Sequence, residues 1–151
     1  MKNILIMAMV LVFGFTVTNA QGKRGTPAQA EALAKKAVEF LKTNGKEKAI
    51  AAFNDIQGKF VDGDLYILLY DLNGKCLAHG ANPKIVGKDM IDMKDADGKL
   101  FVKERLEIAK TKGKGWQNYK WTNPTNKKIE DKTTYIQKVD DLIICSGAYK
   151  K

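Results

Sequence analysis

The sequence predicts an α+β domain in which a five-stranded antiparallel sheet has its helices set to one side. Two observations predict this fold class. Residues 27–55 carry apolar side chains at helical spacing, whereas the chain after Phe60 contains five extended stretches. The dipeptide Asn73-Gly74, a strong hairpin signal, joins the first two of these stretches and favours antiparallel pairing. The length of 151 residues leaves room for one domain.

Residues 1–20 have the features of a secretory signal peptide. Lys2 supplies a short positive region, residues 4–17 are mostly apolar, and Ala20 is a small residue at which a signal peptidase would cut. An uncleaved anchor helix is the alternative, but the apolar run is shorter than the ~20 residues that span a bilayer. We therefore expect cleavage after Ala20 and a periplasmic or secreted mature chain with no membrane span.

Two helices are predicted after a polar leader at residues 21–26. Thr26-Pro27 provides an N-cap followed by proline at the first helical position, and Gly45 stands where a helix ends. A second, shorter helix is expected at about 47–55. Each helix has an apolar face, so each must pack against another element. The apolar stripe of the first helix consists of Ala30, Leu33, Ala34, Ala37, Val38 and Leu41.

The extended stretches differ in character. Residues 64–71 are nearly all apolar or aromatic, which is typical of a strand buried on both faces. An excursion without strand character follows at 80–115 and contains a helix near 100–110. The remaining strands are predicted at 76–79, 115–122, 128–139 and 142–149.

The charge pattern argues against a nucleic-acid partner. The chain has 26 Lys+Arg against 17 Asp+Glu, a net charge of +9, but only Arg24 and Arg105 are arginines. The lysines occur singly or in pairs without interleaved aromatic residues, which is typical of a solvated surface. Docking of these lysines on a polyanion remains an alternative.

Catalytic and metal motifs are missing from the sequence. With His79 as the single histidine, neither a Ser-His-Asp triad nor a His-based metal site is supported, and CxxC, HExxH and P-loop motifs do not occur. Residues 93–104 resemble a calcium loop, but Met93 occupies the position of the first carboxylate ligand. We expect no enzyme activity, no metal and no cofactor.

Eight blocks in order resemble a single Cache domain, the small sensing module of bacterial chemoreceptors and sensor kinases. The resemblance assigns residues 27–151 to one such domain. It implies a PAS-like five-stranded antiparallel sheet behind a long N-terminal helix, with a helical insert covering a pocket. The blocks are Phe60-x-x-Gly63-Asp64-Leu65-Tyr66, Asp71-x-Asn73-Gly74-x-x-x-Ala78-His79, Asn82-Pro83-x-x-x-Gly87-Lys88, Asp95-Ala96-Asp97-Gly98-Lys99-x-Phe101, Gly115-Trp116-x-x-Tyr119-Lys120-Trp121-x-Asn123-Pro124, Lys132-x-x-Tyr135 and Gly147-x-Tyr149, after the long helix.

The resemblance also implies a ligand class and a site. Such domains typically bind small organic acids such as acetate, propionate, lactate or pyruvate. Lys132 would supply the charge and His79 a contact near the pocket mouth. Strict alternation places Lys132 and Tyr135 on opposite faces of a strand, so a bend or bulge between them is required for both to take part. The full set of expected ligand-binding residues is Tyr66, His79, Trp116, Tyr119, Trp121, Lys132 and Tyr135.

Alternatives stay open for these residues. The aromatic rings are equally typical of core packing, and His79 of a buried histidine bonded to its neighbours. We expect a stand-alone sensing domain that reports a small carboxylate to a membrane receptor or sensor kinase. A structural or adaptor protein with the same fold and no ligand is the alternative. The PAS-like strand order would place Cys76 and Cys145 on either side of a third strand, about 9–10 Å apart, so we expect free thiols.

Overall fold

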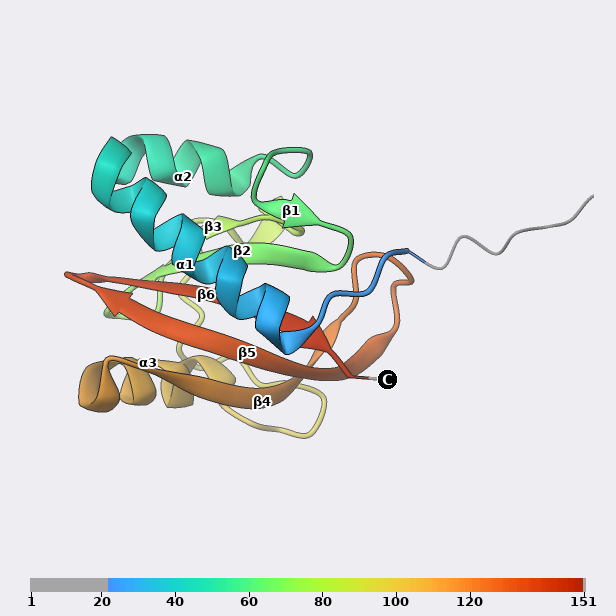
Figure 1. The fold of residues 1–151 in the computed structure, drawn as a ribbon. Helices are drawn as coiled ribbons and strands as arrows, with labels where there is room; N and C mark the ends of the chain where they lie inside the picture. The colour runs from blue at the N-terminus through green and yellow to red at the C-terminus, as the bar shows by residue number, and fades with distance from the viewer. Residues whose placement is uncertain (1–21, 151) are drawn as a thin grey trace, which may run out of the picture.

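The computed structural model describes residues 22–150, and the predicted signal peptide lies outside them. Helices and an antiparallel sheet form an α+β fold, as predicted, with α1 crossing one face of the sheet and α3 lying beyond the other (Figure 1). The helices are α1 (Pro27–Asn44), α2 (Lys46–Asn54), the 3-10 turn η1 (Pro83–Ile85) and α3 (Phe101–Lys112); the strands are β1 (Val61–Asp62), β2 (Leu65–Asp71), β3 (Cys76–His79), β4 (Lys114–Thr122), β5 (Ile129–Val139) and β6 (Leu142–Tyr149).

The sheet is antiparallel throughout and runs in the order β3-β2-β6-β5-β4. This is the predicted PAS-like order. The structure adds β1, which pairs with the beginning of β2 on the same side as β3. Strand β1 was not predicted, because two residues are too short to display an alternating pattern.

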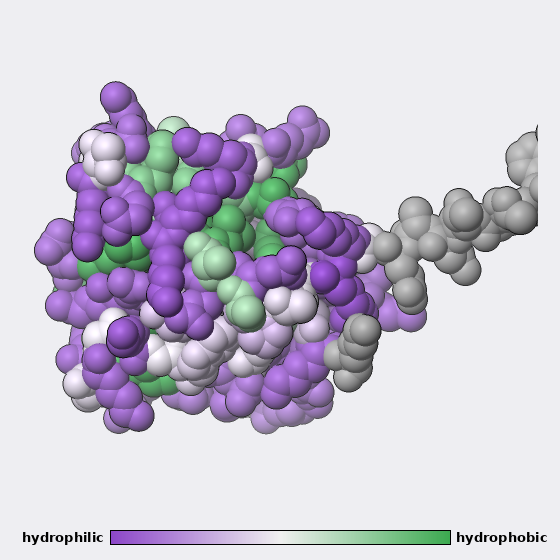
Figure 2. Space-filling view, viewed as in Figure 1, coloured by the Kyte–Doolittle hydropathy of each residue, from purple (hydrophilic) through white to green (hydrophobic). Residues whose placement is uncertain are grey.

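Helix α1 begins with the predicted cap. The hydroxyl of Thr26 accepts the N–H of Gln29 at 3.2 Å, and the Gln29 side chain accepts the N–H of Thr26 at 2.9 Å. The buried stripe is rich in alanine, which allows the helix to lie close to β6 and β5. Viewed from this side, the molecular surface is largely hydrophilic, as expected for solvated lysines (Figure 2).

The turn between β2 and β3 is longer than the predicted two-residue hairpin. The carbonyl of Asp71 accepts the N–H of Gly74 at 3.3 Å, and the N–H of Asp71 donates to the carbonyl of Lys75 at 3.1 Å. The Asp71 carboxylate also accepts the N–H groups of Asn73 and Lys75, each at 2.9 Å. Gly74 has φ +96°, which glycine adopts without strain. The carboxylate therefore stabilises a three-residue loop, 72–74.

The two faces of the sheet carry two separate cores. One face packs against α1 and α2, and the other packs against α3 and the segment 80–100. Strand β2 lies between β3 and β6, so it separates Cys76 from Cys145. Both thiols are buried and free, as predicted. The candidate site belongs to the face covered by α3.

Candidate functional site

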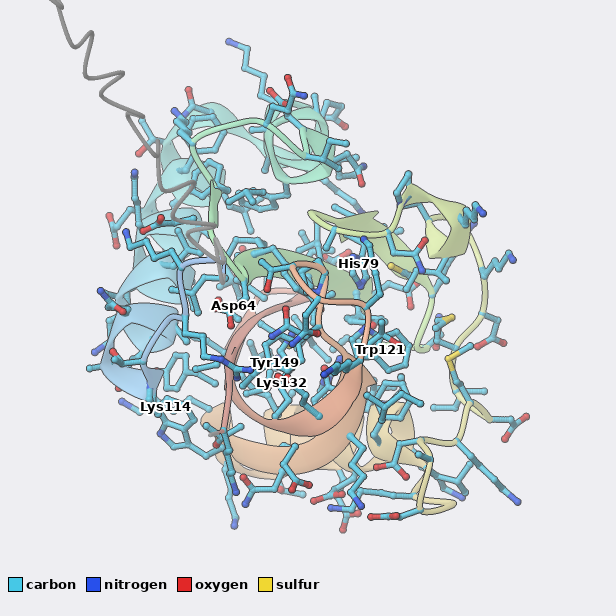
Figure 3. The ribbon with its side chains drawn as sticks, turned by 90° about the vertical axis from the view of Figure 1, so that its right-hand side faces the viewer. Asp64, His79, Lys114, Trp121, Lys132 and Tyr149 are labelled. Carbon is cyan, nitrogen blue, oxygen red and sulfur yellow. The ribbon has the colours of Figure 1, made fainter. Side chains whose placement is uncertain are left out.

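The core under α3 contains a group of buried polar side chains among aromatic rings. Lys132 and Tyr149 lie together in the hollow of the curved sheet, with His79 and Trp121 on the same side of it (Figure 3). We call this region the chamber and define it by Tyr66, His79, Arg105, Tyr119, Trp121, Lys132, Thr134 and Tyr149.

Lys132 is the central cation of the chamber. Strand β5 directs its side chain inward, where it is fully buried and its Nζ has no hydrogen-bond partner. The Nζ atom lies 3.9 Å from the ring centroid of Tyr66 and 4.7 Å from that of Tyr149. Burial, reinforced by the charge of Arg105, holds the pKa of Lys132 well below its usual value. The aromatic faces attract the ammonium group but do not neutralise it.

Arg105 is a second buried cation, and the sequence analysis did not include it in the site. Its Nε donates to Oε1 of Gln117 at 3.2 Å, whereas its two terminal nitrogens have no partner. The guanidinium carbon lies 5.1 Å from the ring centroid of Tyr119 and 5.3 Å from that of Tyr70. One signal was present in the sequence: position 105 follows Val102 by three residues, on the apolar face of the predicted helix.

His79 presents a hydrogen-bond donor to the chamber. Its Nδ1 accepts the N–H groups of Ala81 at 3.1 Å and Asn82 at 2.9 Å, so the ring proton lies on Nε2. Nε2 is buried and has no partner. Burial and the charges of Lys132 and Arg105 lower the pKa of His79 to about 3, which keeps the imidazole neutral at physiological pH. The ring also stacks on Tyr66 at 4.9 Å.

The two tyrosine hydroxyls form a chain that leads out of the chamber. The hydroxyl of Tyr149 donates to the carbonyl of Thr122 at 2.7 Å. Its contact with the hydroxyl of Tyr66, at 3.1 Å, is therefore donated by Tyr66. Both phenol hydrogens are occupied within the protein, so Tyr66 must rotate its hydroxyl before it can donate to a ligand.

A cavity of about 300 Å³ adjoins the chamber at the side where the buried residues Tyr66 and His79 form part of its lining. Trp121 forms part of its wall, and Tyr119 lies deeper, with its ring stacked on Phe101 at 4.8 Å. We call this cavity the mouth of the chamber. It is lined by Tyr66, His79, Ala81, Asn82, Lys84, Trp121, Thr122, Pro124 and Lys127. The structure thus brings together five of the seven residues expected from the sequence: Tyr66, His79, Tyr119, Trp121 and Lys132.

Trp116 and Tyr135 lie on the other face of the sheet, so their predicted place in the site is wrong. Strand β5 pairs with β4 and β6 in unbroken register, without the bulge that would turn Tyr135 toward Lys132. Tyr135 packs in the core beneath α1, and its ring meets that of Trp116 edge-on at 5.3 Å. The Trp116 side chain is also 42% exposed.

The chamber has the composition of an anion site. Nζ of Lys132, the two terminal nitrogens of Arg105 and the imidazole N–H of His79 have no hydrogen-bond acceptor. No group of three metal-ligating side chains occurs within residues 22–150. In the same part of the chain, no helix is long and apolar enough to cross a membrane.

The family is shown by comparison with known proteins. Residues 17–151 match the model of the Cache domain, so the chain belongs to the Cache domain family, whose sensor domains are a non-catalytic fold. It is 37% identical over 90 residues to the methyl-accepting chemotaxis protein McpP of Pseudomonas putida, which covers 58% of this chain and 16% of the relative. It is 30% identical over 88 residues to the sensor histidine kinase MctS of Rhizobium johnstonii, covering 57% and 19%. The matches thus span less than a fifth of either relative.

Solved structures share the fold. A periplasmic sensor domain of a chemotaxis protein superposes with a TM-score of 0.65 at 21% identity, covering 82% of this chain and 90% of the other. A methyl-accepting chemotaxis protein of Vibrio parahaemolyticus gives 0.68 at 20% identity, covering 81% and 86%. A Cache chemosensory domain described for carboxylic acid recognition gives 0.64 at 25% identity, covering 82% and 88%.

Proposed function

We propose that the chamber binds a small carboxylate, of the acetate, propionate, lactate or pyruvate class, and that the domain reports this ligand to a signalling partner. The observation that carries the proposal is the pair of buried cations, Lys132 and Arg105: Nζ of the lysine and the two terminal nitrogens of the arginine lack hydrogen-bond acceptors. Buried charges are normally paired, because an unpaired charge in a medium of low polarity is costly. A carboxylate supplies the missing negative charge and up to four acceptor positions.

The surroundings of the cations support a ligand rather than an internal partner. The nearest buried carboxylate, that of Asp64, accepts the N–H of Gly25 at 2.7 Å and the amide of Asn123 at 3.4 Å. Its charge acts on Lys132 without a direct contact, and its effect on the pKa of Lys132 opposes the lowering by burial. Asp64 therefore holds the N-terminal leader and the β4–β5 connection together, and the cations remain available.

The size of the mouth favours a small acid. A volume of about 300 Å³ lies at the lower end of the range for small-molecule sites. The carboxylic acid recognition described for a structural neighbour at 25% identity agrees with this chemistry. An exported sensing domain that meets its ligand outside the cytoplasm and signals through a membrane receptor or sensor kinase fits the relatives, and a catalytic role has no support in the chamber.

Calorimetry on the purified protein tests the proposal. Acetate, propionate, lactate and pyruvate are titrated beside propionamide, which has nearly the same shape as propionate but no charge. We expect at least one acid to bind and the amide not to bind. Lys132→Met should weaken acid binding by about 10- to 150-fold, the loss of one hydrogen bond to a charged group. Lys138→Met, an exposed position on the same strand, is the matched control.

A panel in which no acid binds would refute the proposal and favour an adaptor that keeps the fold without a ligand. Equal binding by the Lys132→Met and Lys138→Met proteins would show that the anchoring cation is another residue.

A further inference from the structure

The hydroxyl of Thr134 is a buried polar group in the chamber to which the proposed function assigns no role. Its Oγ1 has no hydrogen-bond partner, and the residue is fully buried two positions after Lys132 on the same face of β5. A Cβ placed on Gly147 would lie 2.2 Å from this Oγ1 and 2.7 Å from Cε of Lys132. The hydroxyl and the end of the lysine side chain therefore meet in one small space above Gly147.

Thr134 also lies between the two cations. It is paired with Gln117 across β4 and β5, and Oε1 of Gln117 accepts the Nε proton of Arg105. Lys132 flanks Thr134 along its own strand, while Arg105 flanks it on the side of Gln117. All three side chains keep unpaired polar atoms. A bound acid would therefore meet donors on more than one side.

A simple fatty acid satisfies only part of this arrangement. Its carboxylate would occupy the donors of one cation, and its methylene groups would leave other buried donors without acceptors, which is unfavourable. An ammonium group on the second carbon would face two cations and be repelled. An oxygen on the second carbon, in contrast, accepts hydrogen bonds from the donors that the carboxylate does not reach.

We propose that the ligand is a small acid with an oxygen on its second carbon, a 2-oxo or 2-hydroxy acid, and that Thr134 recognises this oxygen and thereby determines specificity. The inference rests on the proposed function. A 2-oxo acid accepts the proton of the Thr134 hydroxyl, whereas a 2-hydroxy acid can also donate its own proton to Oγ1. Both ligands share the oxygen acceptor that propionate and alanine lack.

Four three-carbon acids that differ only at the second carbon provide the test: pyruvate, lactate, propionate and alanine. In calorimetry on the purified protein, we expect pyruvate or lactate to bind at least about fivefold more tightly than propionate. Alanine should not bind. The stronger of pyruvate and lactate identifies which oxygen, oxo or hydroxyl, the chamber prefers.

Thr134→Val removes the hydroxyl while keeping the shape of the side chain. This variant should bring pyruvate and lactate to within about twofold of propionate and leave propionate affinity unchanged. Thr133→Val, at the adjacent position on the opposite face of β5, is the matched control and should preserve the wild-type ratios.

The outcomes separate the two proposals. If propionate binds wild-type protein as tightly as pyruvate and lactate, the inference is overturned while carboxylate binding stands. If Thr134→Val weakens all three acids equally, Thr134 has a structural role and the inference is again overturned. If no acid binds at all, the proposed function fails first. A melting temperature measured for each variant identifies any loss of folding.

Discussion

Replacing Lys132 by methionine should stabilise the ligand-free protein while it weakens binding. The ammonium group is fully buried without a hydrogen-bond partner, so the folded state bears the cost of removing it from water. Methionine has a similar length and no charge. Replacing buried ion pairs by apolar residues of similar volume is often neutral or stabilising by about 1–4 kcal/mol, and here the charge removed has no partner to lose.

The size and sign of the effect can be measured by thermal unfolding. For a domain of this size, 1 kcal/mol corresponds to about 3–6 °C in melting temperature. The pKa of Lys132 is lowered in the folded state, so the folded wild-type protein binds this proton less readily than the unfolded chain. Wild-type stability should therefore fall as pH decreases below the ordinary lysine pKa, and the advantage of methionine should grow in the same direction.

The exposed Lys138→Met protein is the control and should change the unfolding free energy by no more than about 0.5 kcal/mol. A gain in stability together with weaker acid binding would identify Lys132 as a residue retained for binding. The reasoning is refuted if Lys132→Met destabilises the ligand-free protein by several kcal/mol. Such a loss would mean that the ammonium group has stabilising partners within the fold.

Three further results are expected. The ion pair with Arg24 lowers the pKa of Glu130 to about 2. The stability that this pair contributes is complete above about pH 4.5 and is lost as pH falls toward 2. In the Arg24→Gln protein, the melting temperature should therefore depend less on pH over that interval than in the wild type. Gly147→Ala should destabilise the fold by about 1–3 kcal/mol and reduce acid binding, because the added methyl group would overlap the buried side chain of Lys132. Unchanged acid binding would contradict the position of the chamber. Cys76 and Cys145 should resist maleimide in the native protein and react once it is unfolded. Both thiols are buried, and burial raises the pKa of Cys76 to about 12 and that of Cys145 to about 11. A mass of the intact protein that is lower by two hydrogens would show a disulfide instead.

Lys132 and Tyr135 lie three residues apart on β5 and on opposite faces of the sheet. Alternation along β5 already placed them on opposite faces, and both could belong to the site only if a bend or bulge intervened. The unbroken pairing with β4 and β6 removes that condition. The period-two rule was therefore more reliable at this point than the grouping of aromatic residues in one motif.

Local physical chemistry was sufficient for the elements and their order. The capping box at Thr26, the alanine stripe of α1 and the apolar run of β2 are all interactions between residues close in sequence, which is why the sequence by itself determined the helices, the five main strands and the α+β class. The chamber depends on contacts between distant residues. Arg105 became part of it only because α3 packs across β4, and Thr134 only because Gly147 leaves space on the neighbouring strand. Side-chain burial and the lack of a partner are properties of the packed tertiary structure, so only that structure decided which polar groups were left to meet a ligand.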